Sequence, residues 1–385
     1  MALLAMLALS ACSSDDSAAE ADSQSVVVVF QLSIPRTEAA STRATTETVA
    51  AGSELEHRLS SLHVALYNKQ GEFIAQEQGL RITKQQTIST GNYEYTANVE
   101  VSMVVPEDKR TTAEFEGELV VYANTGIPAS ASYVGTGISD LTFQLSSNTA
   151  PDALPMWGMR AIKADDNVVL TAGTRNDLTG SDAIDLMRSV AKVTVDLTSE
   201  MVNDGWTFED LWLTRYNPLG YVLPKGYYSG TVAPYTFTSA TTLMTYTGDN
   251  NARFNPYAVT TTGNDGSSTT TVNSGALIDL HFNDGNAATA GLPIYIPEYD
   301  NTTSGVTPSA IRLKLMHNNV SEGTTYELKF ANYSGNDDHA VSGTEFNLVR
   351  NTWYQYHVYK LSEHKIGVTL TVKPWYYVEH DPIVM

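Results

Sequence analysis

The residue types that carry catalysis or bind metals are present, but not in the patterns that these activities require. None of the eight histidines lies in an HExxH pattern, which places two zinc ligands on one helix face. The sequence contains no GxSxG nucleophile elbow and no GxxxxGKS/T phosphate-binding loop. Adjacent carboxylates such as Asp165-Asp166 and Asp337-Asp338 lie in contexts typical of solvated turns. We therefore expect no catalytic residues, no metal site and no cofactor.

The single cysteine is the residue whose type and position indicate a covalent modification. Residues 1–11 are apolar and uncharged, with the length of a signal peptide and too short to span a bilayer. Leu9-Ser10-Ala11-Cys12 closes this stretch and matches the lipobox of bacterial lipoproteins. We expect a signal peptide over residues 1–11, a lipid on Cys12 that holds the chain to the outer membrane, and an acidic linker over residues 12–24. No basic residue precedes the apolar stretch, so we expect translation to begin upstream of Met1.

The composition favours an exported β-protein with a well-filled core. Of 385 residues, 42% are hydrophobic and only 17% are charged, and the chain has 21 tyrosines. The formal net charge of -20 repels phosphate groups, so nucleic acid is not an expected partner. One cysteine allows no disulfide within the chain, so stability must come from burial of apolar surface.

The apolar residues follow the two-residue period of strands, and helical periodicity is nearly absent. Between residues 93 and 103, apolar and polar side chains alternate strictly, as in a half-buried strand. Ser25 to Ile34 is a β-branched run that predicts a strand buried on both faces. The sequence therefore predicts an all-β fold of two β-sandwich domains, over residues 25–198 and 199–385.

A polar segment follows the first predicted strand. Residues 35–52 are rich in Thr, Ala, Ser and Glu and have no apolar period, which predicts an exposed loop. The loop carries Arg36 and Arg43, where a protease could bind an extended backbone. Pro35 restricts the backbone beside Arg36, so Arg43 is the better site.

Several segments, taken together and in order along nearly the whole chain, resemble the fimbrillin family, the subunits of the type V pili of Bacteroidales. These segments are the lipobox at Cys12, Val26 to Ile34, Thr42-Arg43-Ala44, Leu119 to Asn124, Leu154 to Gly158, Arg188 to Val193, Ile294 to Tyr299, Arg350 to Tyr354 and Val372 to Trp375. The resemblance implies two transthyretin-like β-sandwich domains. It also implies export as a lipoprotein to the cell surface, where the subunit becomes part of a fimbrium.

The resemblance further implies assembly by strand exchange. An arginine-specific protease cuts the N-terminal loop, which points to Arg43 or, failing that, Arg36. The first strand then leaves, and the groove accepts a strand from the C-terminal end of another subunit. Physical chemistry agrees, since removing a strand leaves unpaired backbone groups and bare apolar surface that a donated strand restores.

The C-terminal segment contains residues suited to a donor strand. Ile366, Val368, Leu370 and Val372 alternate with small or polar residues, and Val378 lies in the tail beyond them. Two alternatives stay open. Either Ile366 to Met385 is exchanged as a whole, or Ile366 to Val372 is the last strand of its own domain and only the tail after Trp375 is donated.

Three functions fit these features. The first is a pilus shaft subunit whose partners are other pilus subunits. The second is a monomeric surface lipoprotein that binds a glycan or host protein, because the aromatic residues in Trp206–Tyr228 and Trp353–Tyr377 could stack on sugars, although aromatics that alternate in strands more often form core. The third is an anchor or tip subunit of the same pilus. A loop that can be cut and a free C-terminal tail favour the shaft.

Overall fold

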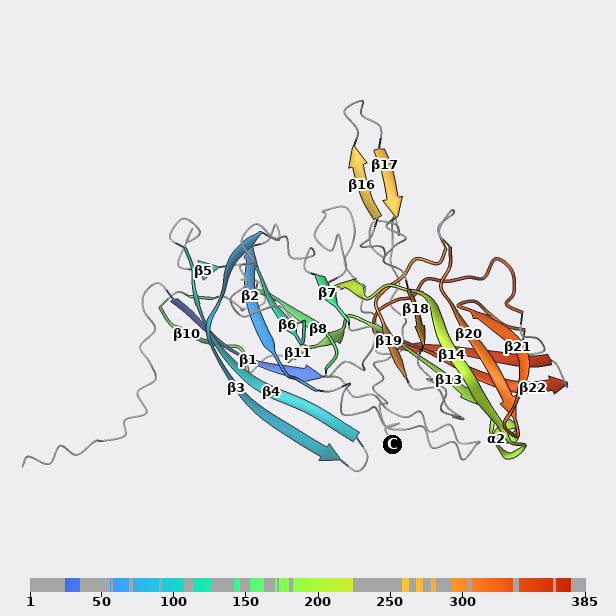
Figure 1. Cartoon of the computed structure of the whole chain (residues 1–385). Helices are drawn as coiled ribbons and strands as arrows, with labels where there is room; N and C mark the ends of the chain where they lie inside the picture. Colours follow the sequence, from blue (N-terminus) through green and yellow to red (C-terminus); the bar gives the residue numbers. More distant parts are fainter. Residues whose placement is uncertain are drawn as a thin grey trace, which may run out of the picture.

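In the part of the chain that the structure describes, the regular structure is almost all β-strand, with the short helix α2 (Ser199–Asn203), which confirms the all-β prediction (Figure 1). The computed structural model describes residues 25–34, 56, 58–68, 72–89, 92–106, 114–115, 117–125, 142–145, 153–162, 170–171, 173–179, 183–223, 258–262, 268–272, 278–281, 293–302, 307–334, 339–362 and 365–374. No helix in these ranges is long and apolar enough to cross a membrane.

In the N-terminal half, residues 25–188, nine of the described strands form one sheet. Its order is β10 (Arg175–Asp177), β1 (Ser25–Ile34), β4 (Asn92–Val104), β3 (Phe73–Ser89), β2 (Leu62–Asn68), β6 (Gly117–Ala123), β8 (Met156–Ile162) and β12 (Met187–Arg188), with β11 (Ile184–Asp185) paired to β1. The short strands β5 (Glu114–Phe115) and β9 (Leu170–Thr171) pair with each other beside this sheet.

Strand β3 belongs to both parts of this sheet, because it changes partner along its length. Its first residues pair with β2 and the rest pair with β4, with a register shift between Glu77 and Gly79. Where β3 leaves β2, the Glu77 carboxylate accepts a hydrogen bond of 2.8 Å from the backbone N–H of Val64 and lies 2.8 Å from the His63 ring nitrogen Nδ1. The sheet therefore folds back on itself at β3. As a result, β1 and β4 lie on one side of a single shared core, and β2, β6 and β8 lie on the other.

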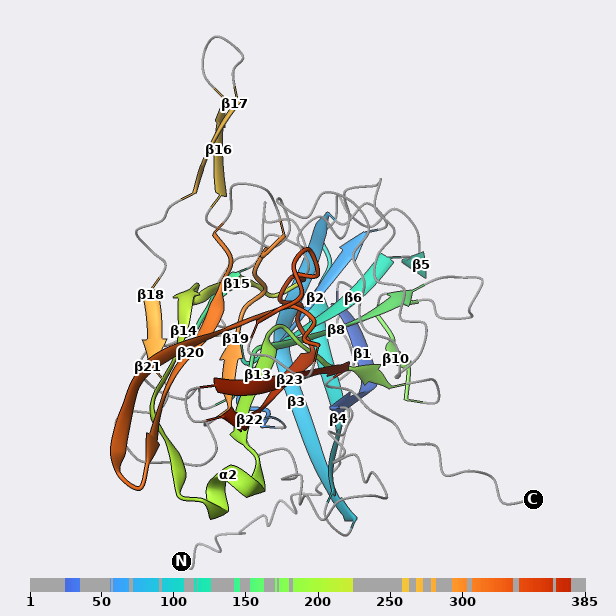
Figure 2. The same ribbon diagram turned by 90° about the vertical axis from the view of Figure 1, so that its right-hand side faces the viewer.

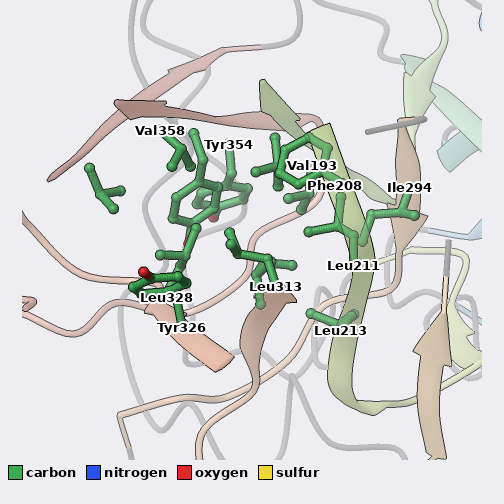
Figure 3. Close-up of a cluster of buried hydrophobic side chains, with 14 of the residues drawn as sticks. Val193, Phe208, Leu211, Leu213, Ile294, Leu313, Tyr326, Leu328, Tyr354 and Val358 are labelled. Carbon is green, nitrogen blue, oxygen red and sulfur yellow. The ribbon is translucent and has the colours of Figure 1, made fainter. Parts of the chain in front are cut away.

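The C-terminal half, residues 191–374, contains two four-stranded sheets in its described part. One has the order β19 (Ile294–Ile296), β13 (Ala191–Leu197), β22 (Thr352–Ser362) and β23 (Lys365–Pro374), and the other β18 (Ile278–His281), β14 (Trp206–Tyr216), β20 (Ala310–His317) and β21 (Val320–Lys329). Figure 3 shows Val193, Tyr354 and Val358 meeting side chains of β14, β20 and β21, and all of them belong to one buried cluster. Two sheets packed across a shared core form a sandwich.

A separate hairpin extends from this half. Strands β16 (Ala258–Thr262) and β17 (Ser268–Val272) pair only with each other in the described chain and project from the rest in both views (Figure 1; Figure 2).

Strand β13 differs from the predicted division of the chain. The predicted boundary at residue 198 assigns it to the first domain, whereas the strand pairs with β22 and β19 and buries Val193 and Val195 in the second core. The pairing with β22 is parallel and joins distant parts of the sequence, so no local pattern reveals it. The division into two domains stays a prediction, and this pairing moves its boundary to before β13.

The two halves share a third hydrophobic cluster, which includes Tyr67 and Trp157 from the first half and Val222 and Tyr295 from the second. Strands β7 (Thr142–Gln144) and β15 (Leu219–Tyr221) also pair across the boundary. Gly220 permits this approach, because a Cβ atom there would lie only 2.5 Å from an atom of the Phe143 ring. The halves are therefore joined by both apolar packing and backbone hydrogen bonds.

Arg350 ties β15 to the end of β19 from a fully buried position. Its Nη2 atom lies 2.6 Å from Oε2 of Glu298, and the guanidinium also donates to the carbonyl oxygens of Tyr221 and Val222. Both side chains of the ion pair are almost fully buried, at 0% and 6% exposure. Removing one partner would leave the other charge uncompensated inside the protein.

We expect Arg350→Met to destabilise the protein by about 3–5 kcal/mol, because the guanidinium that pairs with Glu298 and donates to two carbonyl groups would be lost. The matched control is Arg312→Met, which removes the exposed ion pair with Glu327 and should cost at most about 1 kcal/mol. Urea unfolding followed by tryptophan fluorescence measures both. Equal costs for the two variants would contradict a structural role for the buried pair.

Candidate functional site

Strand β1 is an interior strand with partners along both edges. On one edge it pairs antiparallel with β4 over its whole length, from Ser25 to Ile34. On the other edge it pairs parallel with β10 at residues 27–29 and with β11 at residues 32–33. Backbone N–H groups of Gly173, Leu178 and Leu186 complete this second edge by donating to carbonyl oxygens of β1. Any strand in this position is fixed in direction and register by two neighbours.

The inner face of β1 is part of the core. Its alternate side chains are Val26, Val28, Phe30, Leu32 and Ile34, each at most 2% exposed. Burial contributes about 1.5–3 kcal/mol for each side chain of this size, so the five together contribute roughly 8–15 kcal/mol. A whole domain is stable by only about 5–15 kcal/mol. The N-terminal half therefore needs a strand here at all times.

The outer face of β1 is covered only in part, which differs from the predicted burial on both faces. Val29 is 6% exposed, but Val27, Gln31 and Ser33 are only half-buried. An ion pair crosses above the strand, because Arg175 of β10 lies 3.1 Å from Glu100 of β4 on the opposite side. With Arg175 51% exposed, this pair contributes little to stability.

Several predicted site residues lie outside the part of the chain that the structure describes. They are the lipidation residue Cys12, the cleavage candidates Arg36 and Arg43, and Val378 of the tail. Their roles stay predictions. The described chain resumes at Glu56 and at Arg58, shortly before β2.

The four remaining donor candidates all lie in β23. Ile366 and Val368 are fully buried in the core of the C-terminal half, whereas Leu370 and Val372 pack against it while partly exposed. Among the described strands β23 pairs only with β22, so it is an edge strand. The Tyr359 ring covers Gly367, where an added Cβ atom would lie 2.4 Å from a ring carbon. The segment thus fills its own core in this structure.

The tryptophans that could have stacked on sugars lie mostly within the protein. Trp206 is 6% exposed and stacks on His317 with ring centroids 4.5 Å apart. Trp212 is 9% exposed and stacks on His281 at 5.4 Å. The half-buried Trp353 lies under the Lys192 ammonium, 4.4 Å from its ring centroid. These three rings therefore serve packing more than they offer an open aromatic face.

The residues beside β1 that were not predicted are in β10 and β11. Each strand has three residues or fewer, too short for an alternation to show, and each contacts β1 from far along the sequence. Among the described residues, no three His, Cys, Asp or Glu side chains are grouped to hold a metal ion. What the arrangement around β1 provides is backbone pairing on both edges and apolar burial on one face, which any strand in this position must supply together.

Comparison with known proteins identifies the class. A family model described as fimbrillin-A associated anchor proteins Mfa1 and Mfa2 matches residues 37–381. The chain is thus a structural component of cell-surface fimbriae, and it belongs to the fimbrillin-A associated anchor protein family. The resemblance seen in the sequence is confirmed. The search of curated protein sequences found no match.

Solved structures of fimbrial proteins are also similar to the chain. One is the tip fimbrial protein Mfa3 of Porphyromonas gingivalis with a C-terminal truncation, at 15% identity and a TM-score of 0.48, covering 91% of this chain and 100% of that one. Another is a fimbrial assembly protein of Parabacteroides distasonis, at 13% identity and a TM-score of 0.45, covering 91% and 99%.

We expect Gly158→Ala to loosen the covered edge of β1. Gly158 lies in β8, where a Cβ atom would lie 2.7 Å from Ile184 Cγ2 and 2.8 Å from the Asp185 carbonyl oxygen, so β11 must shift. Overpacking of this kind costs about 1–3 kcal/mol. The control Gly79→Ala has open space around it and should be nearly neutral. Thermal unfolding compares the two, and equal melting temperatures would contradict close packing of β8 on β11.

Proposed function

We propose that the chain is a fimbrial subunit whose β1 strand is replaced by a strand from a neighbouring subunit. The observation that carries this proposal is the position of β1 itself. The strand is paired on both edges and buried along one face, yet it continues the body of the fold only through the connection to β2. A cut in that connection turns β1 into a separate peptide, which another strand of like pattern can displace.

The proposed precursor is an outer-membrane lipoprotein acylated at Cys12. An arginine-specific protease cuts after Arg43 or, failing that, after Arg36, both of which lie between β1 and β2 in the sequence. Because the empty groove would lose roughly 8–15 kcal/mol of burial, β1 leaves only as the new strand enters. In this proposal each half of the chain is a transthyretin-like β-sandwich domain, and the boundary between the two domains lies before β13.

For the donor we favour the tail after Trp375, which includes Val378. The burial of Ile366 and Val368 supports this choice, because donating β23 would open the core of its own half. The predicted donor strand Ile366 to Val372 then holds the tail in place and is not itself exchanged.

The proposed role is that of a polymerising shaft subunit, and the partners are other fimbrial subunits. A second candidate is an anchor subunit, which the description of the matching family favours. The two roles differ in whether the connection between β1 and β2 is cut, since an anchor that ends the fibre can retain β1.

We expect treatment with an arginine-specific protease to give a product that begins at Ala44 and forms filaments. Mass spectrometry identifies the new N-terminus, and electron microscopy detects the filaments. A synthetic peptide with the sequence Ser25 to Ile34 should inhibit assembly, because it occupies the same groove. A peptide in which Val28 and Phe30 are replaced by Asp is the control. If the protease leaves the connection between β1 and β2 intact and no filaments form, the result would favour the role of an anchor subunit.

We expect truncation after Trp375 to leave folding unchanged but abolish filaments, since it retains β23 and removes the proposed donor. Truncation after Ser362 is the contrast, because it also removes Ile366 and Val368 from the core and should cost about 3–6 kcal/mol. Thermal unfolding and electron microscopy give the two readouts. Filaments of normal length from the first truncation would rule out the tail as donor.

A further inference from the structure

The connection between β1 and β2 contains a third arginine, Arg58, whose side chain is exposed. By sequence alone an arginine-specific protease could cut after Arg58 as readily as after Arg36 or Arg43. The structure distinguishes it, because the backbone around Arg58 is held on both sides.

Asn124, which follows β6, binds the segment from Arg58 to Ser61. Its Nδ2 atom donates to the Arg58 carbonyl oxygen at 2.6 Å and to the Leu154 carbonyl oxygen at 2.9 Å. Its Oδ1 atom accepts hydrogen bonds from the backbone N–H groups of Ser60 and Ser61 at 2.8 and 3.2 Å. The backbone N–H of Asn124 donates to the Ser61 carbonyl oxygen. One side chain therefore fixes the backbone on both sides of the Arg58–Leu59 bond.

Glu56 fixes the chain just before Arg58. Its carboxylate lies 2.6 Å from the ammonium of Lys192 and accepts a hydrogen bond of 3.0 Å from the Tyr295 hydroxyl. Its carbonyl oxygen accepts two hydrogen bonds from the guanidinium of Arg188. Burial lowers the pKa of Arg188 to about 10, with Glu56 opposing the shift, so Arg188 is charged at neutral pH.

Leu59, the residue after the Arg58 peptide bond, is buried in the core of the N-terminal half with 8% exposure. To cut this bond, a protease must bind the chain as an extended strand. The Arg58 carbonyl would have to leave Asn124, and Leu59 would have to leave the core. Cleavage after Arg58 therefore requires local opening of a well-packed segment, and its rate follows the population of that open state.

We propose that Asn124 and Glu56 form a clamp on Glu56 and residues 58–61 that protects Arg58 and ends the cleavable connection upstream of Glu56. This inference rests on the proposed function, in which that connection is cut. The clamp makes Asn124 and Glu56 specificity-determining residues for maturation. Because the clamped segment stays in place after the cut, β1 can leave while β2 and the junction between the halves remain intact.

The test is Asn124→Gly in the full chain, digested with an arginine-specific protease. Asn124 has φ of +57°, which glycine adopts without strain, so this change removes the side chain alone. The N-terminus at Leu59 should appear ~10-fold or more faster than from the unchanged protein, since several hydrogen bonds are lost. The matched control is Asn319→Gly, with φ of +64° in a distant turn, which should leave Arg58 protected.

Two further variants make the result specific. Asn124→Asp keeps the acceptor for Ser60 and Ser61 but loses the donor to the Arg58 carbonyl, so cleavage at Arg58 should accelerate even if Asn124→Gly fails to fold. Adding Arg58→Lys to either variant should abolish the Leu59 terminus. Equal Leu59 formation in the unchanged protein and in the variants overturns the clamp.

The same digest separates the clamp from the proposed function. If the unchanged protein is cut after neither Arg36 nor Arg43, the maturation proposal fails, whereas acceleration at Arg58 in the variants still supports the clamp. If the unchanged protein is cut after Arg43 and also after Arg58 at a similar rate, maturation stands and the clamp is overturned.

Discussion

The N-terminal half depends on one constraint: its core is closed only while a strand lies beside β4. Five large side chains of β1 fill that core, and their burial is worth about as much as the whole stability of an ordinary domain. The groove therefore cannot exist empty for long. In the proposed strand exchange, the subunit carries its own strand until a partner supplies another, so β1 serves as a placeholder as well as a structural element.

The two edges of this position are unequal, and the inequality bears on exchange. β4 pairs with β1 over ten residues, whereas β10 and β11 pair over three and two. In the proposed exchange, an incoming strand therefore gains most of its backbone pairing from β4. The change of partner along β3, from β2 to β4, also determines what β1 faces. It places β4 and β1 on the opposite side of the core from β2, β6 and β8.

The sequence predicted what local pattern can encode and missed what depends on distant pairing. The β-branched run of Val26 to Ile34 predicted β1, and the alternation from Ile366 to Val372 predicted β23. Local alternation could not show whether β23 fills its own core or a neighbour's, because both uses need the same apolar face. The roles of Glu56 and Asn124 were equally hidden, since each depends on contacts with residues more than sixty positions away. For Cys12, Arg36 and Arg43, the sequence predicts a covalent modification or a cleavage, and the surrounding residues have no pattern that predicts a strand or a helix.

In the proposed fibre, the groove of one subunit and the tail of the same subunit lie in different halves, so every link along the fibre passes through the junction between them. That junction combines an apolar cluster, the β7–β15 pairing and the buried pair Lys192–Glu56, and the Arg350–Glu298 pair fixes the end of β15 within the C-terminal half. Buried ion pairs add little net stability, but they tolerate few alternative geometries because a misplaced charge is left uncompensated. Of the two pairs, Lys192–Glu56 crosses between the halves, and we infer that it favours one orientation of the halves. Glu56 contributes this contact from the segment that also bounds the proposed cleavable connection.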